Sequence, residues 1–417
     1  MIIYQVLPRL FRKGKFSSFD KKALTCLKEL GVSHIWMTGA IRHSMGKDYV
    51  KGDIGSPFSI ADYYDVNPYL ATNEDNRIAE FKRALKRTHE SGLKLLLDFI
   101  PNHVSPDYHD EHGGIKTLGI HDYDWTDTDK IDYSDKSNWS KMLDILSYWA
   151  GMGVDGFRCD MVELVPLDFW HYIIAECKTR FPSLTFVAEV YEKNAYGNFV
   201  DAGFDALYDK SGLYDTIRAV VAGHAPASQI TANWQSLGGL QPRMLNFLEN
   251  HDEQRLASPC FAGTPQAGYA SLAVSTLFYP CPFMLYFGQE IGEDAHDGAN
   301  GRTSIFGEQR HIDPISKLSE NETMIQNRYK EVLHLKEALG DAANYDLCYA
   351  QSSENGFDAS RHFAFMRYDK NRCVIVVSNF SKEAARMLIS IPEDAPQAFG
   401  QSIEVEVAAQ DFVILSK

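Results

Sequence analysis

Four short segments of this chain each place a carboxylate at the end of an apolar run, and three of them place an Arg or a His beside it. The segments are Asp98-Phe99-Ile100-Pro101-Asn102-His103, Gly156-Phe157-Arg158-Cys159-Asp160, Phe186-Val187-Ala188-Glu189 and Glu249-Asn250-His251-Asp252. A parallel barrel gathers its strand ends at one face, so acids far apart along the chain can converge there. Three carboxylates, one Arg and two His in one pocket suit the hydrolysis of a glycosidic bond.

An alternation of strand and helix patterns, continuing to about residue 340, predicts such a barrel. Eight strand candidates are the apolar runs at 2–7, 32–37, 93–100, 154–157, 184–188, 206–208, 244–248 and 283–287. Helical spacing, as at 19–30, or a capping-box pattern, as at 72–75, lies between most of them. Eight such units predict an α/β fold with a closed TIM (β/α)8 barrel, and the open doubly wound alternative lacks a Gly-rich phosphate fingerprint near the N-terminus.

Two segments depart from the alternation. Residues 104–137 are rich in Asp, His, Gly and Tyr, which predicts a short, loop-rich insert after the third strand, on the catalytic face. From about residue 343 apolar residues recur at period two, which predicts a C-terminal antiparallel β-sandwich. The expected domains are a catalytic barrel formed by 1–103 and 138–342, the insert at 104–137 and the sandwich at 343–417. The loop at 297–303, after the last barrel strand, is a candidate for the wall of the cleft.

Charge and cysteine usage narrow the class of partner and the compartment. A formal net charge of −15, without a run of basic residues, argues against nucleic acid, so we expect a neutral substrate. No apolar run reaches the length that spans a bilayer, and the N-terminus lacks the pattern of a signal peptide. Seven scattered cysteines without a CxxC pair predict reduced thiols and a cytoplasmic protein.

The four segments together resemble, in order and in spacing, the four best-known sequence regions of the α-amylase family, glycoside hydrolase family 13. Three supporting stretches also match: 62–68 after the second strand, 132–133 before the third helix and 286–290 after the eighth strand. The resemblance covers nearly the whole barrel. Seven motifs in register argue against chance recurrence.

This resemblance implies a retaining double displacement. Asp160 would be the nucleophile that forms a covalent glycosyl-enzyme, and Glu189 the general acid that later activates water. Asp252 would hydrogen-bond the sugar hydroxyls and favour the oxocarbenium-like transition state. Arg158, two residues before Asp160 on the same strand, shares its face and can hold that carboxylate ionised. Retention requires the nucleophile and the acid to lie roughly 5–5.5 Å apart.

The resemblance also implies residues that bind the substrate. His103 and His251 would hold hydroxyls of the glucose at the cleaved bond, and Asp98 would be a structural and ring-orienting acid. Phe58 stands where many family members have a stacking Tyr, and Tyr191 is a further aromatic candidate. For these two aromatic side chains, packing in the core is an equal alternative to sugar stacking.

Two positions depart from the family pattern. Typical α-amylases carry a Lys-His pair after the nucleophile that contacts the leaving glucan, whereas this chain has Glu163-Leu164, which puts endo-acting behaviour in question. Calcium-binding members use an Asn like Asn102 and an Asp at the position of Lys130. An ammonium cannot ligate calcium but can take its charge position, so calcium is disfavoured unless Asp129 supplies the missing ligand. No metal and no organic cofactor is expected.

The sequence therefore predicts an intracellular, bacterial enzyme that cleaves α-1,4-glucosidic bonds in maltooligosaccharides or α-glucans by a retaining mechanism. A 4-α-glucanotransferase and an exo-acting α-glucosidase would use the same residues and stay open as alternatives. A non-catalytic sugar-binding or transporter-accessory protein is disfavoured, because all three acids are present and a membrane segment is not. The oligomeric state is not predicted.

Overall fold

The computed structural model describes residues 1–297, 300–303, 305–306 and 310–417. Residues 298 and 299 of the candidate cleft wall therefore lie outside the described residues. The chain forms two compact units. Unit 1 comprises residues 1–208 and 304–317, and unit 2 comprises residues 209–303 and 318–417. The predicted domain limits stay predictions.

The barrel strands correspond one by one to the eight predicted apolar runs. They are β1 (Ile2–Val6), β2 (His34–Met37), β5 (Lys94–Phe99), β8 (Gly156–Cys159), β9 (Thr185–Ala188), β10 (Ala206–Tyr208), β11 (Met244–Phe247) and β12 (Phe283–Tyr286). They close a barrel in the order β1-β12-β11-β10-β9-β8-β5-β2. The predicted α/β barrel is confirmed. Almost all side chains of these strands are buried, as expected where both faces of a parallel strand are covered.

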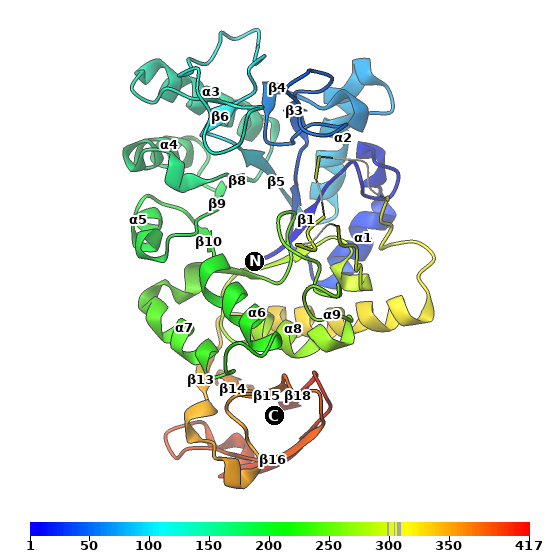
Figure 1. Cartoon of the computed structure of the whole chain (residues 1–417), viewed down its shortest axis with the longest axis vertical. Coiled ribbons are helices and arrows are strands. Elements are labelled where there is room, and N and C mark those ends of the chain that lie inside the picture. Colours follow the sequence, from blue (N-terminus) through cyan, green and yellow to red (C-terminus); the bar gives the residue numbers. More distant parts are fainter. Residues whose placement is uncertain (298–299, 304, 307–309) are drawn as a thin grey trace. The chain divides into compact units, whose positions relative to one another are not determined.

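Within unit 1, successive barrel strands pair in parallel, and the register aligns candidate site residues. Asp98 on β5 is opposite Arg158 on β8, and Arg158 is opposite Val187 on β9. The intervening helices are α1 (Lys21–Leu30), α2 (Arg77–Glu90), α3 (Lys136–Met152), α4 (Leu167–Arg180) and α5 (Tyr196–Asp201). Figure 1 shows α3, α4 and α5 following one another beside β8, β9 and β10.

The entry to α2 differs from the predicted capping box. Asn73, not Thr72, caps the first turn, a 3₁₀ segment, by accepting a hydrogen bond from the Asp75 amide. The carboxylate of Glu80 accepts from the backbone amides of both Thr72 and Asn73, at 2.8 and 3.0 Å. A side chain one turn further along thus satisfies the exposed donors, which a four-residue pattern does not reveal.

Two short antiparallel pairs lie in the loops of unit 1. The hairpin β3 (Ile41–His43) and β4 (Ile60–Val66) follows the second barrel strand, and β6 (His103–Val104) pairs with β7 (Asp129–Lys130). The second pair places His103 opposite Lys130, so it closes the base of the insert. Between them the insert has little regular structure, as its composition predicts.

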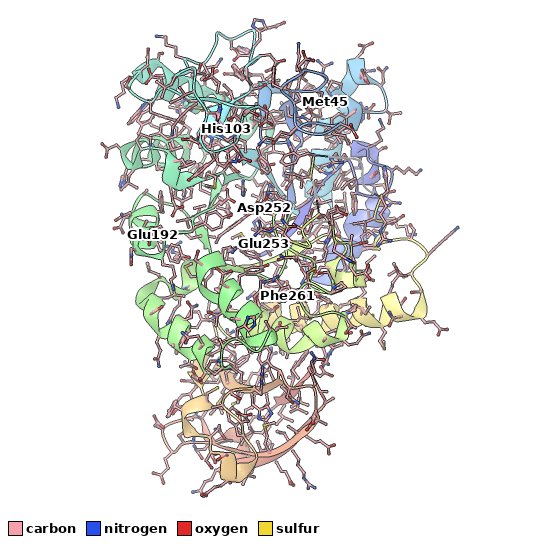
Figure 2. All side chains as sticks on the ribbon, in the orientation of Figure 1. Met45, His103, Glu192, Asp252, Glu253 and Phe261 are labelled. Carbon is pink, nitrogen blue, oxygen red and sulfur yellow. The ribbon has the colours of Figure 1, made fainter. Side chains whose placement is uncertain are left out.

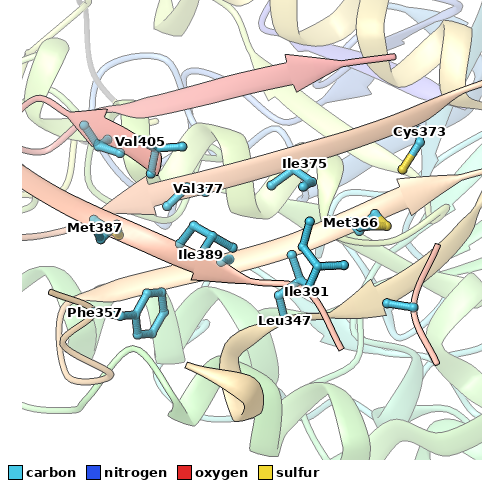
Figure 3. Packing of buried hydrophobic residues seen from close by; sticks show 13 residues of the cluster. Leu347, Phe357, Met366, Cys373, Ile375, Val377, Met387, Ile389, Ile391 and Val405 are labelled. Carbon is cyan, nitrogen blue, oxygen red and sulfur yellow. The ribbon is translucent and has the colours of Figure 1, made fainter. Parts of the chain in front are cut away.

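Unit 2 combines the last barrel strands with the C-terminal sheets. Its helices are α6 (Asp215–Val221), α7 (Gln229–Leu237), α8 (Tyr269–Leu277) and α9 (Glu320–Leu339). One antiparallel sheet has the order β13 (Ala343–Asp346), β14 (His362–Tyr368), β15 (Cys373–Asn379), β18 (Phe412–Ser416), and a second pairs β16 (Ala385–Ser390) with β17 (Ser402–Val407). Both sheets contribute to one apolar core, with Ile375 and Val377 from β15 and Met387 and Ile389 from β16 (Figure 3).

Within the described part of the chain, no helix is both long enough and apolar enough to cross a membrane.

Candidate active site

Three adjacent strands of unit 1 end in the charged residues that the sequence singled out. Asp98 and Arg158 stand near the ends of β5 and β8, Asp160 directly follows β8, and Glu189 directly follows β9. The ladder continues past the strands, since the Asp160 amide donates to Phe99 and the Glu189 amide donates to Cys159. All four side chains are buried, so their charges must be balanced locally.

One guanidinium supplies that balance. Nη1 of Arg158 lies 2.5 Å from Oδ1 of Asp160, and Nη2 lies 2.8 Å from Oε2 of Glu189. Nε donates to the hydroxyl of Tyr208 at the end of β10, at 3.3 Å. The structure thus brings the predicted nucleophile and the predicted acid to the same cation, and the planar fork of Arg suits such shared recognition.

In this group of side chains, burial disfavours the charged forms, whereas the opposite charges of neighbouring side chains favour them. Burial raises the pKa of Asp160 above its ordinary value, and the charge and hydrogen bond of Arg158, which favour the carboxylate, offset only part of this rise. Burial lowers the pKa of Arg158, but Glu189, Tyr208 and Asp160 together raise it well above its ordinary value. Arg158 is therefore a fixed positive charge, and it stabilises an ionised Asp160.

The carboxyl group of Glu189 is held by two further donors. The Met161 amide donates to Oε2 at 2.9 Å, and the hydroxyl of Tyr191 donates to Oε1 at 2.8 Å. Met161 has a φ of 41°, in the left-handed region that bulky side chains rarely adopt. Backbone strain of this kind is typical of functional sites, and here it directs an amide at the predicted acid.

Asp98 is anchored by its own neighbours. Its Oδ1 accepts from the indole of Trp36 and its Oδ2 from the amide of Gly39, both at 2.9 Å. These bonds tie the end of β5 to the end of β2. The guanidinium carbon of Arg158 lies 5.1 Å from the ring centre of Trp36 and 5.6 Å from that of Phe58, so both rings lie beside the charged group.

His103 is buried beside the same aromatic residue. Burial lowers its pKa to about 4, and a hydrogen bond with the backbone of Phe58 only partly opposes this. Its Nδ1 lies 3.2 Å from Nδ2 of Asn102, and its ring centre lies 5.4 Å from that of Trp125 in the insert. The imidazole is therefore neutral near pH 7 and can exchange hydrogen bonds with hydroxyl groups.

The remaining predicted residues, His251 and Asp252, belong to unit 2 and lie in the loop that follows β11. Figure 2 labels Asp252. Nε2 of His251 lies 3.1 Å from Oδ2 of Asp252, whose side chain is 42% exposed. Oδ1 of Asn250 accepts from the amides of Asp252 and Glu253, at 2.8 and 2.9 Å, and so forms the turn that presents Asp252.

The predicted replacement of calcium can be tested against the side chains present. Nζ of Lys130 lies 2.8 Å from Oδ1 of Asp122, whose Oδ2 accepts from Nδ2 of Asn102 at 2.8 Å. The alternative ligand Asp129 instead accepts from the hydroxyl of Thr117. An ammonium group therefore already binds the carboxylate of Asp122, which lies beside Asn102. Over the described ranges, no group of three or more His, Cys, Asp or Glu could hold a metal ion.

Several residues of the site escape sequence reasoning. Tyr208 stands at the end of a predicted apolar strand, as the acids do, so its position could have indicated it. Trp36 carries no such signal, because an aromatic residue in a buried strand is ordinarily part of the core. The left-handed Met161 is not predictable either, since Gly, Asn and Asp are the residues that indicate positive φ.

Comparison with known proteins agrees with this geometry. The family model described as "Alpha amylase, catalytic domain" matches residues 20–139 and 120–391. The chain is 26% identical over 412 residues to the α-amylase MalA of Haloarcula japonica, covering 92% of this chain and 55% of that protein. It is 25% identical over 344 residues to a 4-α-glucanotransferase of Thermotoga maritima, covering 70% of this chain and 72% of the relative.

The fold also matches a solved structure, a maltogenic α-amylase (AmyB) of Thermotoga neapolitana, with a TM-score of 0.74 and 23% identity over 100% of this chain and 96% of the other. The chain spans between 43% and 71% of the length of four curated relatives. The family model nevertheless extends over most of the chain and over all eight barrel strands except β1. The chain belongs to the α-amylase catalytic-domain family.

Proposed function

We propose that this protein is a retaining glycoside hydrolase that cleaves α-1,4-glucosidic bonds in maltooligosaccharides and related α-glucans. The observation that carries the proposal is the single guanidinium of Arg158, which contacts the carboxyl groups of Asp160 and Glu189 at the ends of adjacent barrel strands. Membership of the α-amylase family supports the same roles for these residues.

In the first step, Asp160 attacks the anomeric carbon while Glu189 protonates the leaving glycosidic oxygen, which gives a covalent glycosyl-enzyme. Arg158 keeps Asp160 ionised for this attack. In the second step, Glu189 removes a proton from water, which attacks the same carbon and releases Asp160. Asp252 would hydrogen-bond the sugar hydroxyls and favour the distorted transition state, as the family resemblance implies.

The substrate-binding roles are also proposals. His103, which is neutral near pH 7, and His251 would bind hydroxyl groups of the glucose at the cleaved bond, and the ring of Phe58 would lie against that sugar. Both oxygens of Asp98 accept from the protein, which supports an orienting role more than a direct chemical one. Tyr191 would bind the substrate beside Glu189, the proposed acid.

We infer that the reaction needs no organic cofactor and no calcium, since Lys130 occupies the charge position beside Asn102 and Asp122. We further propose that the enzyme acts in the cytoplasm of a bacterium. All seven cysteines are free thiols, which supports a reducing compartment. A net charge of −15 supports a neutral glucan as the partner and speaks against nucleic acid or an anionic membrane surface.

A second candidate activity, 4-α-glucanotransfer, is favoured by the similarity to the Thermotoga maritima enzyme. Both reactions share the glycosyl-enzyme and differ in whether water or a sugar accepts the glucan. A time course with purified protein and maltoheptaose, resolving every product by length, separates them. Hydrolysis gives products no longer than the substrate with increasing reducing ends. Transfer gives products longer than seven glucose units with nearly constant reducing ends.

The mechanism itself is tested by Asp160→Asn, which removes the nucleophile. We expect turnover of maltoheptaose to fall by roughly a thousandfold or more, with binding of the sugar still measurable by calorimetry. Asp168→Asn, at an exposed position on α4, is the matched control and should keep full turnover. Retained turnover in Asp160→Asn, in a preparation free of host amylase, would contradict the assignment.

A further inference from the structure

The residues that directly follow the proposed nucleophile bind the segment that carries the proposed acid. Met161 donates its amide to Oε2 of Glu189, and the next residue, Val162, donates to the backbone carbonyl of Glu189 at 3.2 Å. Val162 begins a single 3₁₀ turn, Val162–Leu164, and Glu163 is its middle residue. The loops after β8 and β9 are thereby linked residue by residue.

Glu163 extends this link with its side chain. Its Oε1 accepts from the amide of Tyr191 at 3.2 Å and from the amide of Glu192 at 2.5 Å. A carboxylate that binds two successive amides fixes the path of the backbone there, because charge-assisted bonds to amide donors are strong. Glu163 therefore determines where the backbone of Tyr191 lies.

The hydroxyl of Tyr191 contacts the proposed acid directly, because it donates to Oε1 of Glu189 at 2.8 Å. Its side chain is half-buried, so this bond is partly shielded from water. The path from Glu163 through the backbone of Tyr191 to its phenol ends on the carboxyl group that must first give and then accept a proton.

We propose that Tyr191 and Glu163 are positioning residues for Glu189: the Tyr191 hydroxyl holds its carboxylate in place and favours its ionised form, and Glu163 holds Tyr191. This inference rests on the proposed function, because it assumes that Glu189 is the acid and base. A hydrogen bond donated to a carboxylate stabilises the charged form, which serves the second step, when Glu189 activates water. The same hydrogen bond makes protonation of Glu189 less favourable, which disfavours the first step. The Tyr191 hydroxyl therefore affects the two steps in opposite directions.

Other groups around this carboxyl group stay constant in the experiment: Arg158 forms an ion pair with Glu189, and Asp98 and Tyr208 act on Arg158. Arg158, Asp160 and Asp98 lie at the ends of β8 and β5, and Tyr208 lies at the end of β10. None of them is altered by a change at position 191. A difference between Tyr191→Phe and the wild type therefore reports the phenol.

The test is the pH dependence of kcat/KM for maltoheptaose, whose alkaline limb reports loss of the acid's proton in the free enzyme. Tyr191→Phe keeps the ring and removes the donor, so the pKa of Glu189 rises and the alkaline limb moves to higher pH. We expect a shift of about one pH unit, the size of one hydrogen bond to a charged group. Thermal unfolding of each variant verifies that the fold is retained.

Two variants of Glu163 test whether its side chain positions Tyr191. Glu163→Gln and Glu163→Ala both lose the charge, but only Gln keeps an oxygen that accepts from the two amides. The alkaline limb of Glu163→Ala should therefore lie at a higher pH than that of Glu163→Gln. In a Tyr191→Phe background this difference should vanish, because residues that act through one group are not additive. Glu176→Gln, at an acid on α4 whose partner is Arg180, is the control and should leave the limb in place.

An unmoved alkaline limb in an active Tyr191→Phe variant would overturn the role of the phenol. A difference between the two Glu163 variants that persists without the Tyr191 hydroxyl would overturn the anchoring role. Failure of the proposed function is distinct, because the wild-type protein itself would then leave maltoheptaose unchanged.

Discussion

The buried Arg158 explains why the site requires this residue type and not a lysine. Its three nitrogens lie against three different oxygens, those of Asp160, Glu189 and Tyr208. A lysine offers a single point charge and cannot face both carboxyl groups in one plane. The cost of burying the guanidinium is offset by its attraction to the two carboxyl groups and by the hydrogen bonds that it donates.

Lys130 is a second residue whose type matters, because we propose that it makes the protein independent of calcium. We expect that excess EDTA changes neither the activity nor the melting temperature, because an ammonium already neutralises Asp122 beside Asn102. Activity assays and thermal unfolding with and without EDTA check this. Lys130→Ala should lower the melting temperature, whereas Lys116→Ala, which removes an exposed partner of Asp135, should have less effect. Activity lost in EDTA and restored by calcium alone would contradict the prediction.

At this scale the sequence predicts residue types better than their contacts. The motif around Asp160 places Arg158 on the same face of the strand, and the structure confirms that the two side chains meet. The sequence marks Glu163 only as a departure from the family. Its bonds to the amides of residues 191 and 192 depend on how two loops fold against each other, which no local pattern encodes.

Among the structural elements, the loop after β11 shows how a short segment can be held rigid. Glu249 is fully buried and accepts from the amide of Leu256 at 2.7 Å and from Nη1 of Arg255 at 3.0 Å. Arg255 also donates to the carbonyl of Phe287 at 2.9 Å. These bonds join the two ends of the segment 249–256, which carries His251 and Asp252. The loop is therefore closed by side chains and not by secondary structure.

Breaking this closure should affect stability and catalysis together. We expect Glu249→Ala to lower the free energy of unfolding by about 3–5 kcal/mol, because it leaves the buried Arg255 without its partner. The double variant Glu249→Gln/Arg255→Met removes both charges and should cost much less. Urea unfolding measures the stabilities, and kcat on maltoheptaose measures the placement of Asp252. Equal stability of the single variant and the wild type would contradict the closure.

The elements themselves were predictable where a periodic pattern determines them. All eight barrel strands appear as apolar runs, since both faces of each are covered, and the period-two segments form the C-terminal sheets. The hairpin of β3 and β4 was not predicted, because Ile41–His43 is too short for a period to be seen. The entry to α2 was predicted with the wrong cap, because Glu80 reaches back from the next turn.

For the molecule as a whole, three buried histidines contribute to how stability depends on pH. Burial lowers the pKa of His34 to about 3 and those of His43 and His103 to about 4, all three in unit 1. In the unfolded chain each has an ordinary pKa near 6.5. At these three positions the unfolded chain therefore binds more protons than the folded one between pH 6.5 and 4, so their contribution to stability is fully present above pH 6.5 and is lost as the pH falls.

His43→Gln tests this directly, because the ring of His43 is 4% exposed and binds the carbonyl of Ser44 and the hydroxyl of Tyr69. We expect the contribution of these histidines to the free energy of unfolding to be constant from pH 8 to 7 and to fall from pH 6.5 to 4, with at most about 3 kcal/mol lost per buried histidine. His43→Gln should be less stable than the wild type at pH 8, where its contacts are imperfect, yet lose less stability on acidification, since Gln takes up no proton. Urea unfolding across this pH range measures both curves. His171→Gln, at an exposed position on α4, is the control and should follow the wild-type curve. Parallel curves for His43→Gln and the wild type would mean that His43 is protonated equally in the folded and unfolded chains and does not contribute to the acid sensitivity of this protein.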